Sequence, residues 1–226
     1  LLLIKQWKNV FKDEELRLYF GIILGSILLI ILNTRGVYST LEETIRHAAF
    51  QVGSIITTTG YATVDFDQWP SFSKTILLCL MVVGASAGST GGGLKVARLL
   101  LLIKGTRRNI RKMLNPRKVE LVRNNGSVVD EQILDNTNAY FAAYVIILVI
   151  CTLVLSLDGF SLETNLSAAI ATFNNIGPGM AAVGPTCNFA AYGVLSKLTM
   201  CLAMLAGRLE IFPILILFSR GTWKRK

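Results

Sequence analysis

The sequence predicts an all-α membrane protein built from two similar units, and three observations support this fold class. Of its 226 residues, 52% are hydrophobic and only 16% are charged, whereas soluble domains carry about 25% charged residues. The apolar residues gather in uncharged runs, including residues 18–32, 75–94 and 139–157, and runs of about 20 residues are long enough to cross a bilayer. The same order of apolar runs and loops occurs twice. A soluble all-helical bundle is the alternative, which the uncharged runs disfavour.

The positive charge of the chain lies next to these apolar runs. The net charge is +9, and the basic residues concentrate at the start of the chain (LLLIKQWKNVFK), at 104–118 (KGTRRNIRKMLNPRK) and at the end (SRGTWKRK). Lys and Arg beside membrane spans are typical of cytoplasmic loops. We therefore expect all three segments in the cytoplasm and no nucleic acid as a partner. The four cysteines have no spacing typical of a disulfide framework or a metal site.

The first unit is expected over residues 16–103. A long apolar span is followed by a short turn and by a shorter helical stretch, LEETIRHAAFQVGSII, which ends in TTTGYA. A polar loop with Asp65 and Asp67 then leads to a second span, which the five glycines of GASAGSTGGGLK interrupt. A continuous helix is unfavourable there, because each glycine costs about 1 kcal/mol relative to alanine inside a helix.

The second unit, residues 136–219, repeats this order. A long span is followed by the turn DGFS, by the shorter stretch LETNLSAAIATF and by NNIGPGM, and a loop leads to the last span. TTTGY at 57–61 matches NNIGP at 174–178, and MVVG at 81–84 matches MLAG at 204–207. Residues 104–135 form a basic cytoplasmic linker between the units, and residues 1–15 and 220–226 form cytoplasmic ends.

The basic segments also predict how each unit crosses the membrane. Each unit begins and ends in the cytoplasm and therefore crosses an even number of times. Its middle stretch of about 12 to 15 residues is too short to span, which indicates a re-entrant helix that enters from outside. Non-helical backbone is tolerated at membrane depth only where it is buried or lines a water-filled path. Each unit is therefore predicted to be a membrane helix, a pore helix, a filter loop and a membrane helix.

The two loops after the short helices are expected to line a cation path. A pore helix that enters from outside directs the negative end of its dipole toward the membrane centre, and carbonyl oxygens can replace the hydration shell of a cation. Gly60 and Gly177 stand at the matching place and let the backbone aim its carbonyls inward. Ordinary turns are the alternative. The predicted filter residues are Thr57, Thr58, Thr59, Gly60, Tyr61, Asn174, Asn175, Ile176, Gly177 and Pro178, with Thr58, Thr59, Asn175 and Ile176 as ion ligands.

The interrupted stretch at 84–95 is predicted to be a gate beneath this filter. It does not fit the phosphate-binding pattern G-x-x-x-x-G-K-[ST], because Leu94 stands where the lysine must be. Arg208 occupies the position equivalent to Ala85, and a charge within a span is a functional candidate. A static kink, and for Arg208 a structural ion pair, are the alternatives. The predicted gate residues are Gly88, Ser89, Thr90, Gly91, Gly92, Gly93 and Arg208.

Four segments carry a family resemblance: TTTGYAT, GASAGSTGGGLK, FNNIGPG and AGRLEIFPILILF. They resemble the Trk/Ktr/HKT potassium transporter superfamily, most closely its bacterial TrkH/KtrB pore subunits. The resemblance implies four repeats around one pore, with 16–103 and 136–219 as the third-type and fourth-type repeats. Residues 1–15 would then be the tail of a preceding repeat, and the N-terminal half would lie outside this sequence. Two chains that pair to complete the pore are the alternative.

The resemblance also implies a function and partners. It implies potassium uptake across the plasma membrane, in bacteria the inner membrane, with K⁺ as the transported ion, no covalent cofactor and no enzymatic activity. It implies contact with membrane lipid, a homodimer, and a cytosolic nucleotide-binding regulatory ring. An ion-coupled secondary transporter, a symporter driven by H⁺ or Na⁺, is the alternative. The preference for K⁺ over Na⁺ stays open, because only two of four filter loops are visible.

Overall fold

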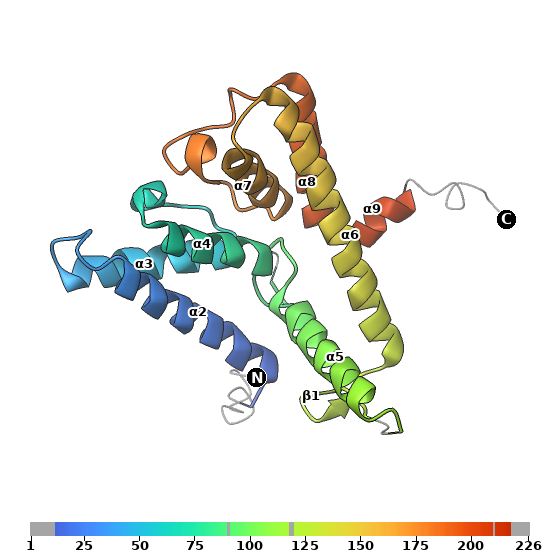
Figure 1. Cartoon of the computed structure of the whole chain (residues 1–226). Helices are drawn as coiled ribbons and strands as arrows, with labels where there is room; N and C mark the ends of the chain where they lie inside the picture. Colours follow the sequence, from blue (N-terminus) through green and yellow to red (C-terminus); the bar gives the residue numbers. More distant parts are fainter. Residues whose placement is uncertain (1–11, 90, 118–119, 210, 218–226) are drawn as a thin grey trace.

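The computed structural model describes residues 12–89, 91–117, 120–209 and 211–217, and this part of the chain is mostly helical (Figure 1), which confirms the expected fold class at that level. The first half contains α2 (Glu14–Asn33), α3 (Leu41–Ile56), α4 (Ser71–Val83) and α5 (Val96–Leu114). The second contains α6 (Glu131–Leu155), α7 (Leu162–Phe173), α8 (Val194–Arg208) and α9 (Ile211–Leu217). Short turns of 3-10 helix lie between them: η1 (Phe66–Gln68), η2 (Ser156–Asp158) and η3 (Ala181–Val183).

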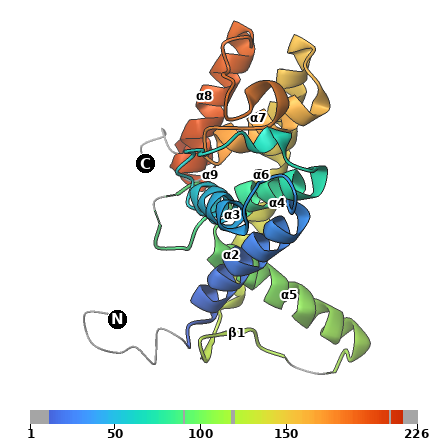
Figure 2. The ribbon, with the colours of Figure 1, turned by 90° about the vertical axis from the view of Figure 1, so that its left-hand side faces the viewer.

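In both halves a long helix is followed by a shorter helix and then by two further helices. In the first half α3 packs between α2 and α4, and in the second α7 packs against α6 and α8 (Figures 1 and 2). Side chains cap the starts of α2, α3, α6 and α7. Asp13 accepts from the N–H groups of Glu15 (2.8 Å) and Leu16 (3.2 Å) at the start of α2, and Ser161 Oγ accepts from the Thr164 N–H (3.3 Å) at the start of α7. Such caps satisfy N–H groups that have no partner within the helix.

Helix α7 contributes to two apolar cores. The first core lies among α2, α3 and α4, and Ile170, Ile176 and Met180 pack into it from α7 and the loop that follows. The second core lies among α6, α7 and α8, and Phe173 packs into it from the same helix. Helix α7 is therefore enclosed by both halves of the chain. Helix α3 is less enclosed, because three large apolar side chains are exposed on it: Leu41, Ile45 and Phe50.

A non-helical segment, residues 84–95, separates α4 from α5. Gly84 ends α4 with a φ of 69°, and the chain turns back so that the Leu94 N–H donates to the Val82 carbonyl (3.2 Å). A Cβ on Gly84 would lie 2.6 Å from the Gly92 carbonyl oxygen. Both the left-handed φ and this close approach therefore require glycine at position 84.

Helices α8 and α9 also meet at a break. α8 ends at Arg208, and α9 leaves in a different direction (Figure 1). Pro213 follows this break. It lies in the first turn of α9, where its missing N–H removes no bond within the helix.

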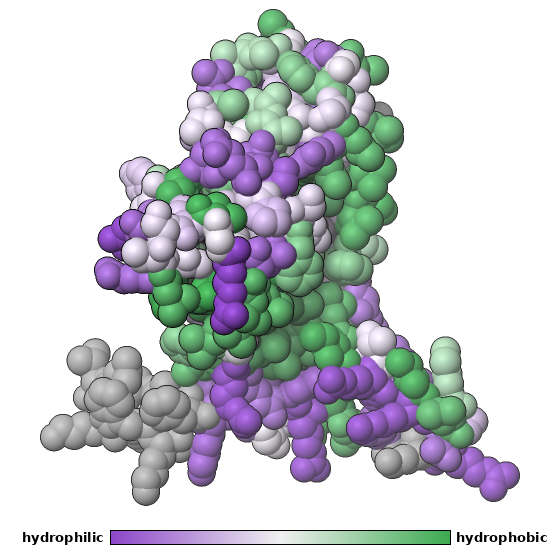
Figure 3. Space-filling view, turned by 60° about the vertical axis from the view of Figure 1, so that its left-hand side comes forward, coloured by the Kyte–Doolittle hydropathy of each residue, from purple (hydrophilic) through white to green (hydrophobic). Residues whose placement is uncertain are grey.

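Within the described residues, two helices are long and apolar enough to cross a membrane, α2 and the helical stretch Glu131–Asp158, and α4 is a shorter apolar helix. Much of their apolar surface faces outward, including Leu24, Leu28, Ile146 and Leu153. Figure 3 shows hydrophilic side chains over the lower end of the molecule, where α5 lies, and a broad hydrophobic flank above them. A soluble monomer rarely exposes so continuous an apolar surface.

The basic linker is folded near α2. Strands β1 (Arg123–Asn124) and β2 (Ser127–Val128) pair antiparallel around Asn125 and Gly126. Asn125 and Gly126 have φ values of 50° and 83°, as a tight type I′ hairpin turn requires. The Glu14 N–H donates to Asn125 Oδ1 (2.9 Å), and Lys104 of α5 pairs with the Glu14 carboxylate. The hairpin therefore fixes the start of α2.

Candidate functional site

The two predicted filter loops begin with the same backbone hydrogen bonds, 117 residues apart. At the end of α3 the Thr57 N–H donates to the Gly53 carbonyl (3.1 Å), and the Thr59 N–H donates to the Ser54 carbonyl (2.9 Å). The equivalent bonds at the end of α7 run from Asn174 to Ile170 (3.0 Å) and from Ile176 to Ala171 (2.9 Å). The alignment of TTTGY with NNIGP therefore corresponds to a common local structure.

Backbone torsions in the two loops match as well. Thr58 and Asn175 have φ values of 57° and 54°, and the glycines two residues later, Gly60 and Gly177, have φ values of 79° and 115°. A left-handed φ is unfavourable for a residue with a side chain and for threonine in particular, because its Cβ is branched. Such residues persist where the surrounding structure determines them, and they cluster at functional sites.

The two loops touch each other at Gly60. A Cβ at this position would overlap with the carbonyl oxygen of Ile176, and it would lie 3.3 Å from Cδ of Pro178. By contrast, a Cβ on Gly177 would meet nothing within 4 Å in the described part of the chain. Only glycine fits at position 60, so segments far apart in the sequence meet here backbone to backbone.

Side chains hold each loop in place. In the first loop Ser54 Oγ donates to the Tyr61 carbonyl (2.6 Å), and the Thr57 and Thr59 hydroxyls bond each other (2.8 Å). The Tyr61 side chain itself is exposed. In the second loop the buried Asn174 side chain bonds the Tyr144 hydroxyl (Nδ2 to Oη, 2.9 Å).

Polar side chains also fix α7 and the start of the second loop. Asn175 Nδ2 donates to the Met204 carbonyl of α8 (2.9 Å). The Tyr192 hydroxyl donates to Oδ1 of the buried Asn165 (2.9 Å). Burial, with a smaller contribution from Asp158, raises the pKa of Tyr192 to about 12. The phenol is therefore protonated and remains a donor at physiological pH.

The predicted gate segment contacts the ends of both short helices. A Cβ on Gly91 would lie 2.9 Å from Thr58 Oγ1, and one on Gly92 would overlap with the Asn174 carbonyl. Gly207 of α8 makes a similar approach, because its Cβ would overlap with the Phe173 carbonyl. The structure thus brings the predicted gate and filter residues together at backbone distance.

Within the described chain the structure gives no hydrogen bond to the filter loops for the predicted gate residues Gly88 and Ser89, and one gate residue lies outside it. Ser89 Oγ accepts from the Gly91 N–H (3.1 Å), and Gly88 has open space around its Cα. Arg208 ends α8 and is exposed, and its contact with the gate segment stays a prediction. Thr90 lies outside the described residues.

Glu15 is a contact of the gate segment that the sequence did not indicate. Its Oε1 accepts from the Ala87 N–H (2.7 Å), although the two residues are 72 positions apart. Glu15 lies in the first turn of α2, next to Glu14, which the linker hairpin fixes. No local pattern reveals this contact, because an acidic residue in a first turn has an ordinary helix-dipole explanation.

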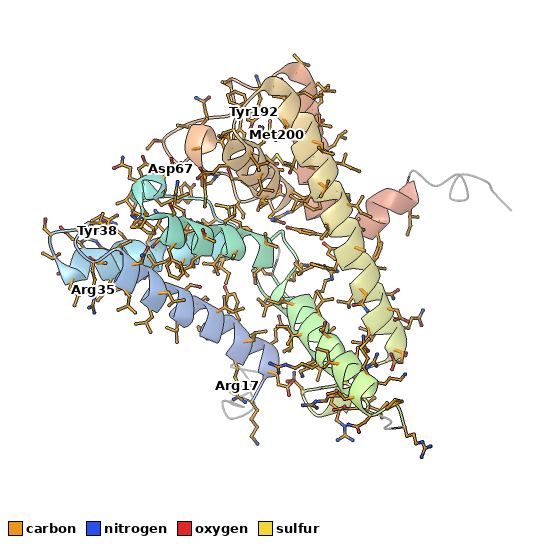
Figure 4. The ribbon with its side chains drawn as sticks, in the orientation of Figure 1. Arg17, Arg35, Tyr38, Asp67, Tyr192 and Met200 are labelled. Atoms are coloured by element: carbon orange, nitrogen blue, oxygen red, sulfur yellow. The ribbon has the colours of Figure 1, made fainter. Side chains whose placement is uncertain are left out.

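An apolar cavity of about 580 Å³ lies beside the second loop. Its wall is formed by the loop residues Asn175, Ile176 and Gly177 and by side chains of α8, among them Met200 and Cys201. Figure 4 labels Met200, which lies on α8. The outer side of the second loop is therefore open and apolar along α8.

Comparison with known proteins identifies relatives of the chain. Residues 18–224 match the family described as TrkH, cation transport protein. The chain is 35% identical over 219 residues to the Trk system potassium uptake protein TrkH of Escherichia coli (strain K12), which covers 96% of this chain and 45% of that protein. It is 33% identical over 222 residues to the Trk system potassium uptake protein TrkG of the same strain, at 97% and 45% coverage.

A solved structure agrees with these matches. The crystal structure of the potassium transporter TrkH from Vibrio parahaemolyticus superposes with a TM-score of 0.85 at 35% identity, over 95% of this chain and 46% of that one. The chain spans about half the length of the curated relatives it matches. The family resemblance of the four sequence segments is confirmed: the chain belongs to the TrkH cation transport family.

Proposed function

We propose that this chain forms part of a potassium-conducting pore in the plasma membrane, with residues 57–61 and 174–178 as two of its filter loops. The observation that carries the proposal is the meeting of two loops of equal backbone structure at Gly60 and Ile176, each at the end of a short helix. Helix C-termini favour a cation in front of them, and backbone carbonyls are suited to K⁺. The relatives are named potassium uptake proteins.

The predicted ion ligands are backbone carbonyls and threonine oxygens of Thr58, Thr59, Asn175 and Ile176. The left-handed conformations at Thr58 and Asn175 support this role, because they reverse the chain directly after each short helix. Two further loops would complete the coordination. Open apolar surface supports neighbours on both sides: the exposed face of α3 next to the first loop and the cavity next to the second.

The segment 84–95 is the proposed gate of this pore. Its glycines approach the ends of both short helices, and backbone that passes so close beneath a filter lies in the path of an ion that leaves it. The glycines of the segment have no side chains whose packing a movement would break, whereas the buried Ala85 and Leu94 hold its two ends. Arg208 would add a positive charge that opposes cations while the segment is in place.

The remaining expectations follow from the family. Residues 16–103 and 136–219 would be the third and fourth of four repeats, in a multi-pass protein of the bacterial inner membrane. The basic linker would face the cytoplasm and contact a nucleotide-binding regulatory ring, and two pores would form a homodimer.

Flux through the complete pore that contains these two repeats tests the proposal. Reconstituted in liposomes, it should pass K⁺ down the electrochemical gradient with no proton or sodium gradient present. Current that requires such a gradient would indicate a coupled symporter instead. Absence of K⁺ flux from correctly folded protein, with and without these gradients, would refute the proposed function.

A further inference from the structure

An ion-pair cluster joins the two halves of the chain next to the paired loops. Asp67 Oδ1 accepts from the Ala181 N–H (3.0 Å) and from Lys74 Nζ (3.3 Å), and Lys74 Nζ also donates to Glu163 Oε1 (2.9 Å). Asp67 and Lys74 belong to the first half, and Ala181 and Glu163 belong to the second. Figure 4 labels Asp67 on the turn before α4, at the side that faces α7. The cluster is a direct polar connection between the halves.

The cluster holds both ends of the segment that contains the second loop. Glu163 lies in the first turn of α7, and Ala181 follows the loop that α7 leads into. Ala181 has a φ of 53°, which is unfavourable for an alanine and must be maintained by its surroundings. The bond from its N–H to Asp67 is one such restraint. Asp67 and Lys74 thus restrain the start of α7 and the residues that follow the second loop.

The cluster is partly shielded from solvent. The side chains of Lys74 and Asp67 are 18% and 29% exposed, and that of Glu163 is 51% exposed. Solvent and salt therefore screen the Lys74–Asp67 pair less than an ordinary surface ion pair. The restraint can act at physiological ionic strength.

The equivalent positions in the second half do not repeat the cluster. Lys197, which aligns with Lys74, donates to the Ala190 carbonyl within its own loop (2.8 Å). Gly184 stands 117 residues after Asp67 and offers no carboxylate. Within the described residues the cluster is therefore a feature of the junction between the halves.

We propose that Asp67 and Lys74 are positioning residues that hold the two filter loops at the spacing needed to discriminate K⁺ from Na⁺. The inference rests on the proposed function of the loops. The ion-pair cluster of Asp67 and Lys74, called the clamp below, is a second connection between the loop regions besides the close approach at Gly60. It acts on the segment that follows the second filter loop. Selectivity depends on the distances between carbonyl oxygens. Loss of the clamp should therefore change the ratio of K⁺ to Na⁺ permeability rather than abolish conduction.

The test compares permeability ratios of variants in the complete pore. Asp67→Asn keeps an oxygen for the Ala181 N–H but removes the charge that attracts Lys74, and Lys74→Met removes both ion pairs. Each should lower the ratio of K⁺ to Na⁺ permeability by about threefold to tenfold, the range expected for loss of one partly exposed ion pair or hydrogen bond. Adding Asp67→Asn to Lys74→Met should lower the ratio little further, because Lys74→Met already removes the pair with Asp67.

Asp65 provides a matched control. It lies in the same loop, and its carboxylate accepts locally from the Asp67 N–H (3.2 Å) and from Gln68 Nε2 (3.1 Å). Asp65→Asn removes one acidic charge from this loop without touching the second half, so its permeability ratio should stay within about twofold of the wild type. Lys74→Arg, which keeps the charge, should retain most of the selectivity.

The outcomes separate this inference from the proposed function. Because a ratio is measured within one preparation, it does not depend on how much folded protein is recovered. If the wild type is selective and both Asp67→Asn and Lys74→Met keep its ratio of K⁺ to Na⁺ permeability, the proposed role of the clamp is refuted. The proposed filter is not affected by that result. An equal loss in Asp65→Asn would also overturn the role of the clamp. A wild type without K⁺ conduction would instead remove the function on which the clamp depends.

Discussion

At the scale of single residues, glycines lie where two backbone segments approach each other closely. Gly60 lies against the Ile176 carbonyl, Gly92 against that of Asn174, and Gly207 against that of Phe173. The sequence indicated Gly60 and Gly92, because glycines stand out at a repeated position and inside an apolar run. It paired Gly207 with Gly84 but did not indicate the contact of Gly207 with Phe173, nor the bond from the Ala181 N–H to Asp67, because these partners are set by packing between distant segments.

Gly60→Ala should abolish most potassium uptake. The added Cβ would overlap with the Ile176 carbonyl and would strain a residue with a φ of 79°, and such a clash with backbone is not relieved by a rotamer change. We expect uptake by cells that lack other potassium systems to fall by at least about tenfold. Gly21→Ala in α2, where a Cβ meets nothing within 4 Å, should retain normal uptake. Wild-type rates in Gly60→Ala would argue against a filter at this position.

At the scale of elements, the segment 84–95 and the linker hairpin are the informative parts. The five glycines predict an interrupted helix, because glycine penalties add along a helix. The linker was expected only as a basic cytoplasmic connection between the two units. Its Asn125–Gly126 pair is a sequence signal for a tight hairpin turn, and the structure forms that hairpin against the start of α2. The partnership of Glu15 with Ala87 could not be predicted, because it joins elements through tertiary packing.

Glu15→Ala should loosen the gate segment. The substitution removes the acceptor of the Ala87 N–H, and loss of one partly solvated bond of this kind should shift the gate toward its open state by about threefold. We therefore expect a higher potassium flux through the complete pore in the absence of its regulator. Glu15→Gln is the matched variant, since its amide oxygen can still accept this bond. Equal flux in Glu15→Ala and the wild type would show that this contact does not restrain the gate.

At the scale of the whole molecule, polar and basic ends flank apolar helices. Basic residues of α5 and the linker lie at the lower end in Figure 3, while the loop that contains Cys187 connects α7 to α8 at the other end of the molecule (Figures 1 and 3). Charge bias in the sequence predicted a basic end at the linker, while the basic segments at 1–12 and 219–226 lie almost entirely outside the described residues. The sequence could not predict that α7 is enclosed by both halves of the chain whereas α3 exposes large apolar side chains, because burial depends on which elements become neighbours.

A thiol-labelling experiment tests the sidedness of the molecule. Cys187 is an exposed free cysteine in the loop before α8, so a membrane-impermeant maleimide added outside intact spheroplasts should label it. The measurement uses a background in which Cys79, Cys151 and Cys201 are replaced by serine. Ser127→Cys in the linker hairpin of a Cys187→Ser protein serves as the control, and it should react only after the membrane is opened. Labelling of that control from outside would reverse the proposed topology.

The shared position of α7 also has a consequence for biosynthesis. Ile170, Ile176 and Met180 complete the core formed by α2, α3 and α4, yet they are translated after all three of those helices. Chains fold from the N-terminal side as they leave the ribosome, so the first half must enter the membrane with a gap in its core. That gap closes only when α7 is inserted. The insertion of α7 is therefore the step at which the two halves pack against each other.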